Sequence, residues 1–148
     1  MGEGDKARLV AWNRELTEVH ARLRAALSAT RDVTGARDLL LYCHGFCAAL
    51  TGHHEGEDRE LFPALVAQHP ELRDTVRRLE QDHSMIAYLL GGLQAAVDRS
   101  ATPAELERHL EGVAAIMESH FRYEERTLLP SLETLVLDAD PRAALGPL

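Results

Sequence analysis

Several sequence features are scarce in this chain of 148 residues, and each scarcity narrows the possible fold and function. No apolar run is long enough to span a bilayer, and no charged-then-apolar leader opens the sequence. We therefore expect a cytoplasmic protein without a membrane partner. The formal net charge is −8, and because an acidic surface repels polyphosphate chains, we expect no nucleic-acid partner either.

Cysteine is nearly absent. Cys43 and Cys47 lie one helical turn apart within an apolar stretch, so they cannot link distant segments of the chain. We expect two buried thiols that pack as small apolar groups. A redox or soft-metal role is the alternative.

No stretch alternates apolar and polar residues for long enough to predict a β-strand, whereas four stretches repeat apolar residues at intervals of three and four. This pattern predicts an all-α protein with a single domain over 1–148. The expected helices cover about 5–27, 35–66, 70–98 and 103–136. Four helices with short connections pack as an antiparallel up-down four-helix bundle.

Capping residues and prolines set the expected helix boundaries. Thr102, Pro103 and Glu105 form a capping-box sequence, which makes the start of the fourth helix the best defined boundary. The polar segment 28–35 is expected to link the first two helices, and the C-terminal ALGPL is expected to fray.

Each of the four apolar stripes carries one histidine near its middle: His20, His53, His83 and His120. Two stripes add a glutamate four residues later, Glu57 and Glu124. Residues four apart sit about 40° round a helix and about 6 Å along it, so each pair presents imidazole and carboxylate to the same volume. Folding this two-helix repeat back on itself brings six polar side chains together in the bundle core.

The two histidine-glutamate pairs lie in similar segments, HHEGEDRELFP at 53–63 and HFRYEERTLLP at 120–130. The register leaves a choice between His53 and His54 and between Glu57 and Asp58. Counting back ten residues from each proline selects His53 and Glu57, and it places Asp58 and Glu125 on the outer side. We expect the helix to loosen near Pro63.

Six ionisable groups among leucine, valine, isoleucine and phenylalanine would cost several kcal/mol apiece if they were buried without partners. Bound metal removes that cost. Four imidazoles and two carboxylates supply ligands for two divalent ions with bridging carboxylates. A nitrogen and oxygen ligand set without thiolate suits iron first, then zinc, manganese or copper.

The order of these motifs along the chain resembles the hemerythrin-like (HHE) cation-binding domain family, from about Leu9 to Leu135. The resemblance implies a four-helix bundle with a metal centre in its core, which holds two iron ions (Fe²⁺/Fe³⁺) bridged by oxide or hydroxide. It implies dioxygen, hydrogen peroxide or nitric oxide as partners. The ligands that it implies are His20, His53, Glu57, His83, His120 and Glu124.

The sequence departs from the oxygen-carrying hemerythrins, whose ligand set resembles five histidines with HxxxH on the third helix. Here the position four after His83 is Ala87. This departure predicts an open metal site that processes oxidants. The activities that it suggests are those of a peroxidase, a catalase-like enzyme or an oxidase. Reversible dioxygen or nitric oxide binding or sensing, oxidation of a small substrate in a dedicated pathway, and metal storage are the alternatives.

The remaining candidates have weaker signals. Tyr42 and Tyr123 are candidate hydrogen-bond donors beside the ligands. His44, His54 and His69 are expected at the surface, and His109 at the rim of the bundle. A ferritin-like di-iron site is disfavoured because that design uses Glu-x-x-His and is rich in carboxylates. The sequence does not indicate which oligomeric state the protein adopts.

Overall fold

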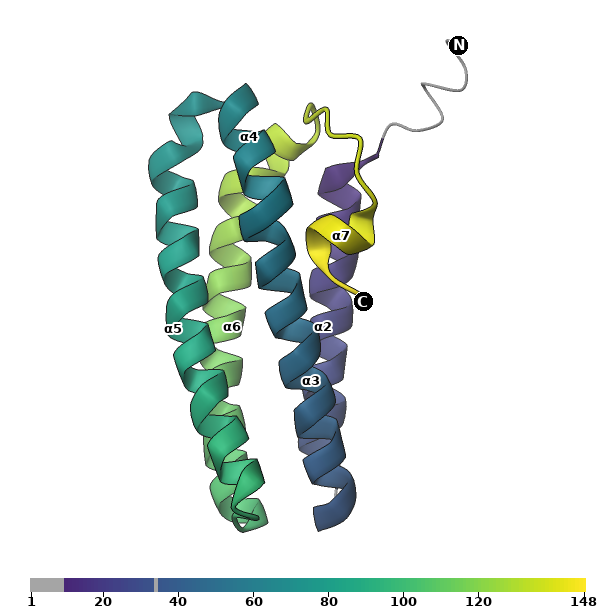
Figure 1. The fold of residues 1–148 in the computed structure, drawn as a ribbon, viewed down its shortest axis with the longest axis vertical. Coiled ribbons are helices and arrows are strands. Elements are labelled where there is room, and N and C mark those ends of the chain that lie inside the picture. Colours follow the sequence, from purple (N-terminus) through teal and green to yellow (C-terminus); the bar gives the residue numbers. More distant parts are fainter. Residues whose placement is uncertain (1–9, 34) are drawn as a thin grey trace.

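Four long helices run side by side, up and down, in the computed structural model, which describes residues 10–33 and 35–148 (Figure 1). They are α2 (Trp12–Asp32), α3 (Ala36–Gly56), α5 (Arg73–Asp98) and α6 (Pro103–Leu132). A π-helix, η1 (Glu57–Leu61), continues α3 into α4 (Phe62–Gln68), and a 3-10 turn, η2 (Pro70–Leu72), leads into α5. The short α7 (Pro141–Leu145) follows α6. The expected all-α helical bundle is confirmed.

The start of α6 follows the capping sequence in part. The Thr102 hydroxyl accepts a hydrogen bond from the backbone N–H of Glu105 at 3.3 Å, and Pro103 occupies the first turn. The Glu105 carboxylate pairs with Arg99 at the end of α5. The turn between α5 and α6 is therefore held from both sides.

Two expected boundaries are wrong. Residues 28–32 continue α2 rather than forming a linker. Thr30 is buried there, and its hydroxyl donates to the carbonyl of Ala26 at 2.8 Å, so it is satisfied within the helix. Helix α6 ends at Leu132, short of the expected 136. The expected first turn at residues 5–9 lies outside the described residues.

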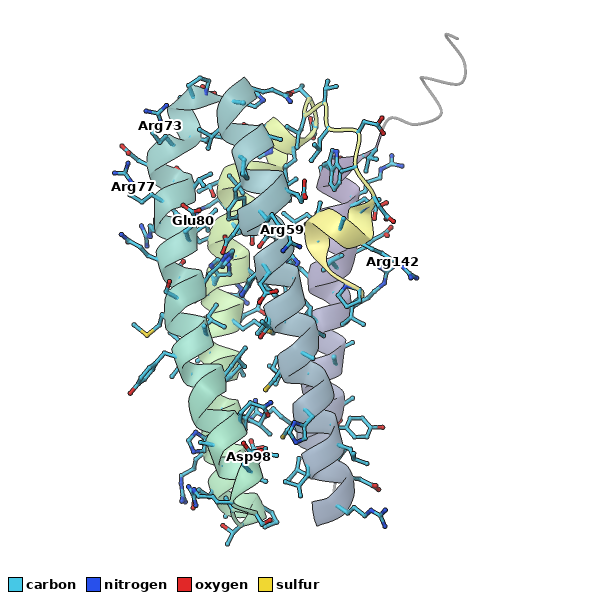
Figure 2. All side chains as sticks on the ribbon, viewed as in Figure 1. Arg59, Arg73, Arg77, Glu80, Asp98 and Arg142 are labelled. Carbon is cyan, nitrogen blue, oxygen red and sulfur yellow. The ribbon has the colours of Figure 1, made fainter. Side chains whose placement is uncertain are left out.

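The core is built from the apolar stripes. Buried side chains from all four long helices meet, among them Trp12, Leu50, Leu79 and Phe121. Truncating one such leucine to alanine typically costs about 2 to 5 kcal/mol. Charged side chains such as Arg73, Arg77 and Glu80 of α5 project outward instead (Figure 2). Among the described helices, none is both long and apolar enough to cross a membrane.

The C-terminal residues pack against the bundle, so the expected frayed tail is wrong. Helix α7 lies against α2, α3 and η1 (Figure 1), with Ala144 and Leu145 fully buried. Asp140 caps this helix by accepting a hydrogen bond from the N–H of Arg142 at 3.0 Å. Arg22 of α2 donates to the carbonyl of Leu148 at 2.8 Å. The tail thus covers one face of the bundle beside α3.

Candidate metal centre

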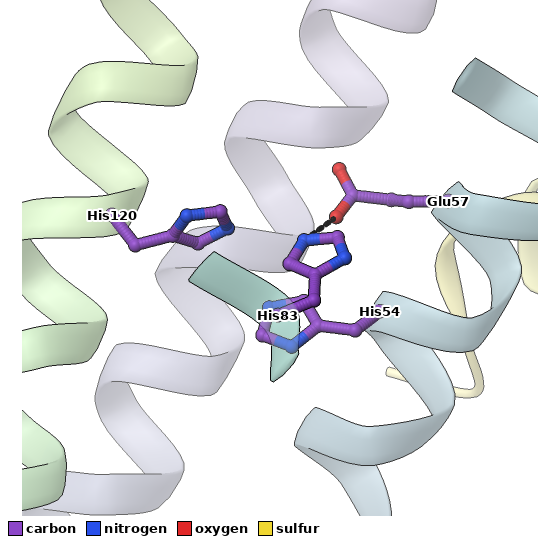
Figure 3. A group of neighbouring side chains, drawn as sticks. All are labelled: His54, Glu57, His83 and His120. Atoms are coloured by element: carbon purple, nitrogen blue, oxygen red, sulfur yellow. Dashed lines mark ion pairs between the residues drawn. The ribbon is translucent and has the colours of Figure 1, made fainter. Parts of the chain in front are cut away.

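Seven buried histidine and glutamate side chains meet at one level of the bundle core. They are His20 of α2, His53 and His54 of α3, Glu57 of η1, His83 of α5, and His120 and Glu124 of α6. They form two groups of four that share Glu57, and in each group the candidate ligand atoms lie within 4.8 Å of one another. One group is His54, Glu57, His83 and His120 (Figure 3); the other is His20, His53, Glu57 and Glu124. All six residues predicted as ligands lie in these groups.

The sequence prediction placed His54 wrongly. We expected it at the surface, but it is 6% exposed and belongs to the first group. Adjacent residues differ by about 100° round a helix, and Glu57 falls at about 40° from His53, between the two histidines. Both imidazoles therefore flank the same carboxylate. The choice between His53 and His54 that the sequence register left open is not needed, because both face the centre.

The π-helix continues α3 directly after these histidines. The N–H of Phe62 donates to the carbonyl of Glu57, five residues back, and Pro63 has no N–H with which to continue the regular α-helical pattern. The loosening expected near Pro63 thus takes the form of a π-turn that begins at Glu57 itself. Single π-turns within helices are frequent at functional sites.

Four of the five histidines are held by a hydrogen bond at Nδ1. The acceptors are Glu125 for His20 at 2.6 Å, Asp58 for His83 at 2.8 Å, Asp82 for His120 at 3.1 Å, and the carbonyl of Leu145 for His53 at 2.8 Å. Such bonds fix the ring orientation and leave Nε2 to face the core. Asp58 and Glu125 lie outside both groups, and each orients a histidine on a neighbouring helix.

The contact from α7 determines the tautomer of His53. A carbonyl oxygen only accepts, so Nδ1 of His53 carries the proton and donates to Leu145. Burial, together with the nearby His20, lowers the pKa of His53 to about 3, so the ring is neutral near pH 7. Its Nε2 therefore presents a lone pair, 3.4 Å from a Glu57 oxygen that also only accepts while it is ionised.

The C-terminal turn fits tightly against this histidine. Gly146 has a backbone φ of +92°, and a Cβ built on it would lie 2.7 Å from the backbone nitrogen of His53. A Cβ on Gly56 would lie 2.8 Å from the backbone of Ala144. These two glycines allow the close approach that brings the Leu145 carbonyl to the His53 ring.

The centre has the chemistry of a cation site. Ten buried side-chain nitrogen and oxygen atoms of the described residues have no hydrogen-bond partner, and nine of them are the Nε2 atoms of the five histidines and the four oxygens of Glu57 and Glu124. Burial and the adjacent Glu124 carboxylate raise the pKa of Glu57, because two buried carboxylates in contact resist ionising together. Lone pairs aimed at one another in a dry core are satisfied by bound metal.

The two halves of the centre are related by an approximate twofold repeat and differ at one position. His54 stacks on His83 with ring centroids 3.8 Å apart, and Phe121 stacks on His20 at the same centroid distance. His54 and Phe121 each follow the first histidine of their segment, His53 and His120. One half therefore has an additional imidazole where the other has a buried phenyl ring.

Ala87 is exposed and lies one turn beyond His83, beside a surface cavity that His54 and His83 also line. The expected exchangeable position at the metal stays a prediction. On this helix the inward direction follows His83, Ile86 and Leu90, all buried, and a residue four after His83 is turned to the other side of that stripe. A fifth buried imidazole in the two groups comes from His54 on α3.

The two tyrosines predicted beside the ligands differ in their positions relative to the centre. Tyr42 is 48% exposed and lines a surface pocket with Leu41, Phe46 and Leu148, so its expected place beside the centre is wrong. Tyr123 is half-buried, with the Arg78 guanidinium 4.3 Å from its ring centroid. A hydrogen bond from Tyr123 to a ligand stays a prediction.

The other histidines and the cysteines lie away from the two groups. His44 is exposed and near Gln94, and His69 is partly exposed near Thr134. Both cysteines are buried and free, and burial raises the pKa of Cys47 to about 12, which makes its thiol a poor nucleophile. The expectation of two buried thiols is confirmed.

Comparison with known proteins agrees with the geometry. The hemerythrin HHE cation binding domain matches residues 8–132 of the 148. No curated protein and no solved structure matches the chain. The match spans the four long helices and every residue of the two groups. The chain belongs to the hemerythrin HHE cation binding domain family.

Proposed function

We propose that this protein holds two iron ions in the centre and that the reduced pair reacts with dioxygen, hydrogen peroxide or nitric oxide. The observation that carries the proposal is the set of nine unpartnered nitrogen and oxygen atoms buried in one place. The proposed ligands are His20, His53, His54, Glu57, His83, His120 and Glu124. Imidazole and carboxylate without thiolate favour iron over softer metals, with zinc or manganese as other occupants.

The side chains divide into ligands and positioning groups. Glu57 belongs to both groups, so it would contact both ions, and Glu124 reaches the histidines His20 and His120, at 3.3 and 3.5 Å. Asp58 and Glu125 keep their histidines in the tautomer that presents Nε2. When bound, a ferrous pair supplies two electrons to an oxidant and an exchangeable position for a small ligand.

The difference between His54 and Phe121 locates the more open half. The group around His20 and His53 has two imidazoles, whereas the group around His83 has three. Phe121 is fully buried and presents an apolar wall to the two-imidazole half. We propose that the small oxidant would react at this half, where Phe121 supplies an apolar surface in place of a third imidazole.

Reversible binding of dioxygen or nitric oxide is the second candidate. Five inward imidazoles favour it, because a five-histidine set resembles that of the oxygen carriers. The two candidates differ in their products. An oxidant-processing centre oxidises irreversibly in air and consumes added peroxide, whereas a carrier loses its dioxygen-dependent absorption bands under argon and remains ferrous.

The test is metal analysis followed by reaction. The purified protein should contain two irons per chain, and the anaerobically reduced form should change its near-ultraviolet absorption when dioxygen, peroxide or nitric oxide is added. A matched pair of variants checks the ligands: His53→Ala should sharply lower the iron content, and His44→Ala should leave it intact. Equal iron in His53→Ala and the unaltered protein would refute the ligand set.

A further inference from the structure

A surface cavity reaches two histidines of the three-imidazole half of the centre, His54 and His83. It lies between α3 and α5, has a volume of about 200 Å³ and is lined by Thr51, His54, Glu55, Asp58, His83, Ser84, Ala87 and Leu90. We refer to it as the access cleft. Its inner wall is formed by His54 and His83, which are buried, and its outer part by exposed residues such as Glu55 and Ala87.

The chemistry changes along the access cleft in a way that suits a cation. The outer part carries the carboxylates of Glu55 and Asp58, and the Asp58 side chain is 40% exposed. The inner wall carries two imidazoles whose Nε2 atoms are buried and have no hydrogen-bond partner. Carboxylate oxygens at the mouth collect hard divalent cations, and imidazole nitrogens further in bind iron.

Asp58 joins the two ends of this path. One of its oxygens accepts from Nδ1 of His83 at 2.8 Å, and the same ring directs Nε2 toward Glu57 at 3.3 Å. A cation that meets the Asp58 carboxylate at the mouth is thus one imidazole away from the centre. The charges at the mouth favour Fe²⁺ and neutral molecules over anions.

Ala87 gives the cleft its opening. Its methyl group lies at the exposed lining, and a larger side chain there would extend over a cavity of only about 200 Å³. We propose that the access cleft between α3 and α5 is the route by which divalent metal enters and leaves the centre, with Glu55 and Asp58 as the first contacts and Ala87 as the position that keeps it open. This inference rests on the proposed metal centre.

A route has a kinetic signature that a ligand lacks. Narrowing it slows metal uptake and release by the same factor and leaves the equilibrium affinity unchanged, because the bound state is untouched. We expect Ala87→Trp to slow both rates by at least roughly tenfold. Ala95→Trp is the matched control, since Ala95 is an exposed alanine on the same helix and does not line the cleft.

The experiment uses the full-length chain and Co²⁺, whose visible absorption reports on binding without any redox reaction. Uptake is followed by stopped flow, release by transfer to excess EDTA, and affinity by titration. Glu55→Lys should slow uptake about 3- to 10-fold at low ionic strength and lose most of this effect at about 0.5 M salt. Glu111→Lys, an exposed position on α6, should have little effect.

A removable plug keeps the test decisive if Ala87→Trp folds poorly. Ala87→Cys treated with a bulky methanethiosulfonate should exchange Co²⁺ slowly, and reduction followed by removal of the reductant should restore the rate. Equal rates for Ala87→Trp, plugged Ala87→Cys and the Ala95 control would overturn the route while leaving the metal centre intact. A chain that takes up no Co²⁺ would overturn both proposals, and Co²⁺ uptake without iron reactivity would overturn the proposed reaction alone.

Discussion

Replacing His54 by phenylalanine should move the stability of the metal-free and metal-loaded protein in opposite directions. The substitution reproduces the arrangement already present at Phe121, so the stacking on His83 is retained. In the metal-free protein it removes a buried Nε2 without a partner, a group that costs about 1 to 3 kcal/mol. The metal-free form should gain up to that amount, or roughly 2 to 12 °C in Tm.

The metal-loaded form should lose stability because it loses a ligand. Removing a group that merely orients a ligand costs about 10- to 100-fold in metal affinity, so losing an imidazole should cost at least that. A 100-fold loss reduces the stabilisation by bound metal by about 2.7 kcal/mol.

The assay is thermal unfolding with metal and after EDTA treatment, beside His44→Phe as the exposed control. Stabilisation of the loaded form, or destabilisation of both forms by equal amounts, would refute the placement of His54 in the centre.

Three other predictions test the surroundings of the centre. Glu125→Gln should weaken metal affinity about 10- to 100-fold by loosening His20, yet this variant should still bind two ions at saturation. Glu124→Gln should bind one ion fewer. Titration with Co²⁺ measures both, and identical titrations of the two variants would contradict the division into ligands and positioning groups. Leu145→Ala should lower the free energy of unfolding by about 2 to 5 kcal/mol, measured with urea, and an unchanged midpoint would mean that α7 is not docked. His53 is neutral in the fold, whereas the unfolded chain protonates it below about pH 6.5. This group should therefore remove roughly 4 to 5 kcal/mol of stability from the metal-free protein between pH 6.5 and pH 3 and have no effect above pH 6.5. Equal urea midpoints at pH 4.5 and 7.5 would contradict this prediction.

The bundle and most of the centre follow from local periodicity. His20, His53, His83 and His120 share their stripes with leucines and other apolar residues, and a stripe of period 3.6 faces the core wherever the helix lies. The spacing of four between histidine and glutamate fixes their common direction. These relations need no knowledge of the partner helices.

His54 was misplaced because the inward-facing stripe of a helix is wider than one residue. The inward arc of α3 is wide enough for two adjacent histidines on either side of Glu57, and the spacing of three from His54 to Glu57 was available in the sequence as a sign of it. On α5 the arc lies on the Ile86 side of His83, which leaves Ala87 outside. Periodicity gives the middle of the inward-facing surface of a helix, and packing against the neighbouring helices determines how far that buried surface extends on either side.

The sequence could not predict the role of α7, for a different reason. Asp140 and Pro141 carry the sequence signal of a helix start, yet five residues are too few to show a stripe. Its position depends on contacts across 92 residues between Leu145 and His53. Such long-range contacts come from the tertiary structure alone.

The proposed binding of two iron ions by the seven buried side chains is tested most directly by the iron content of the protein after anaerobic reconstitution and gel filtration. We expect two irons per chain in the unaltered protein and a sharp loss in a variant that carries His53→Ala and His120→Ala. An unaltered protein that elutes without iron, or a double variant that retains two irons, would contradict it.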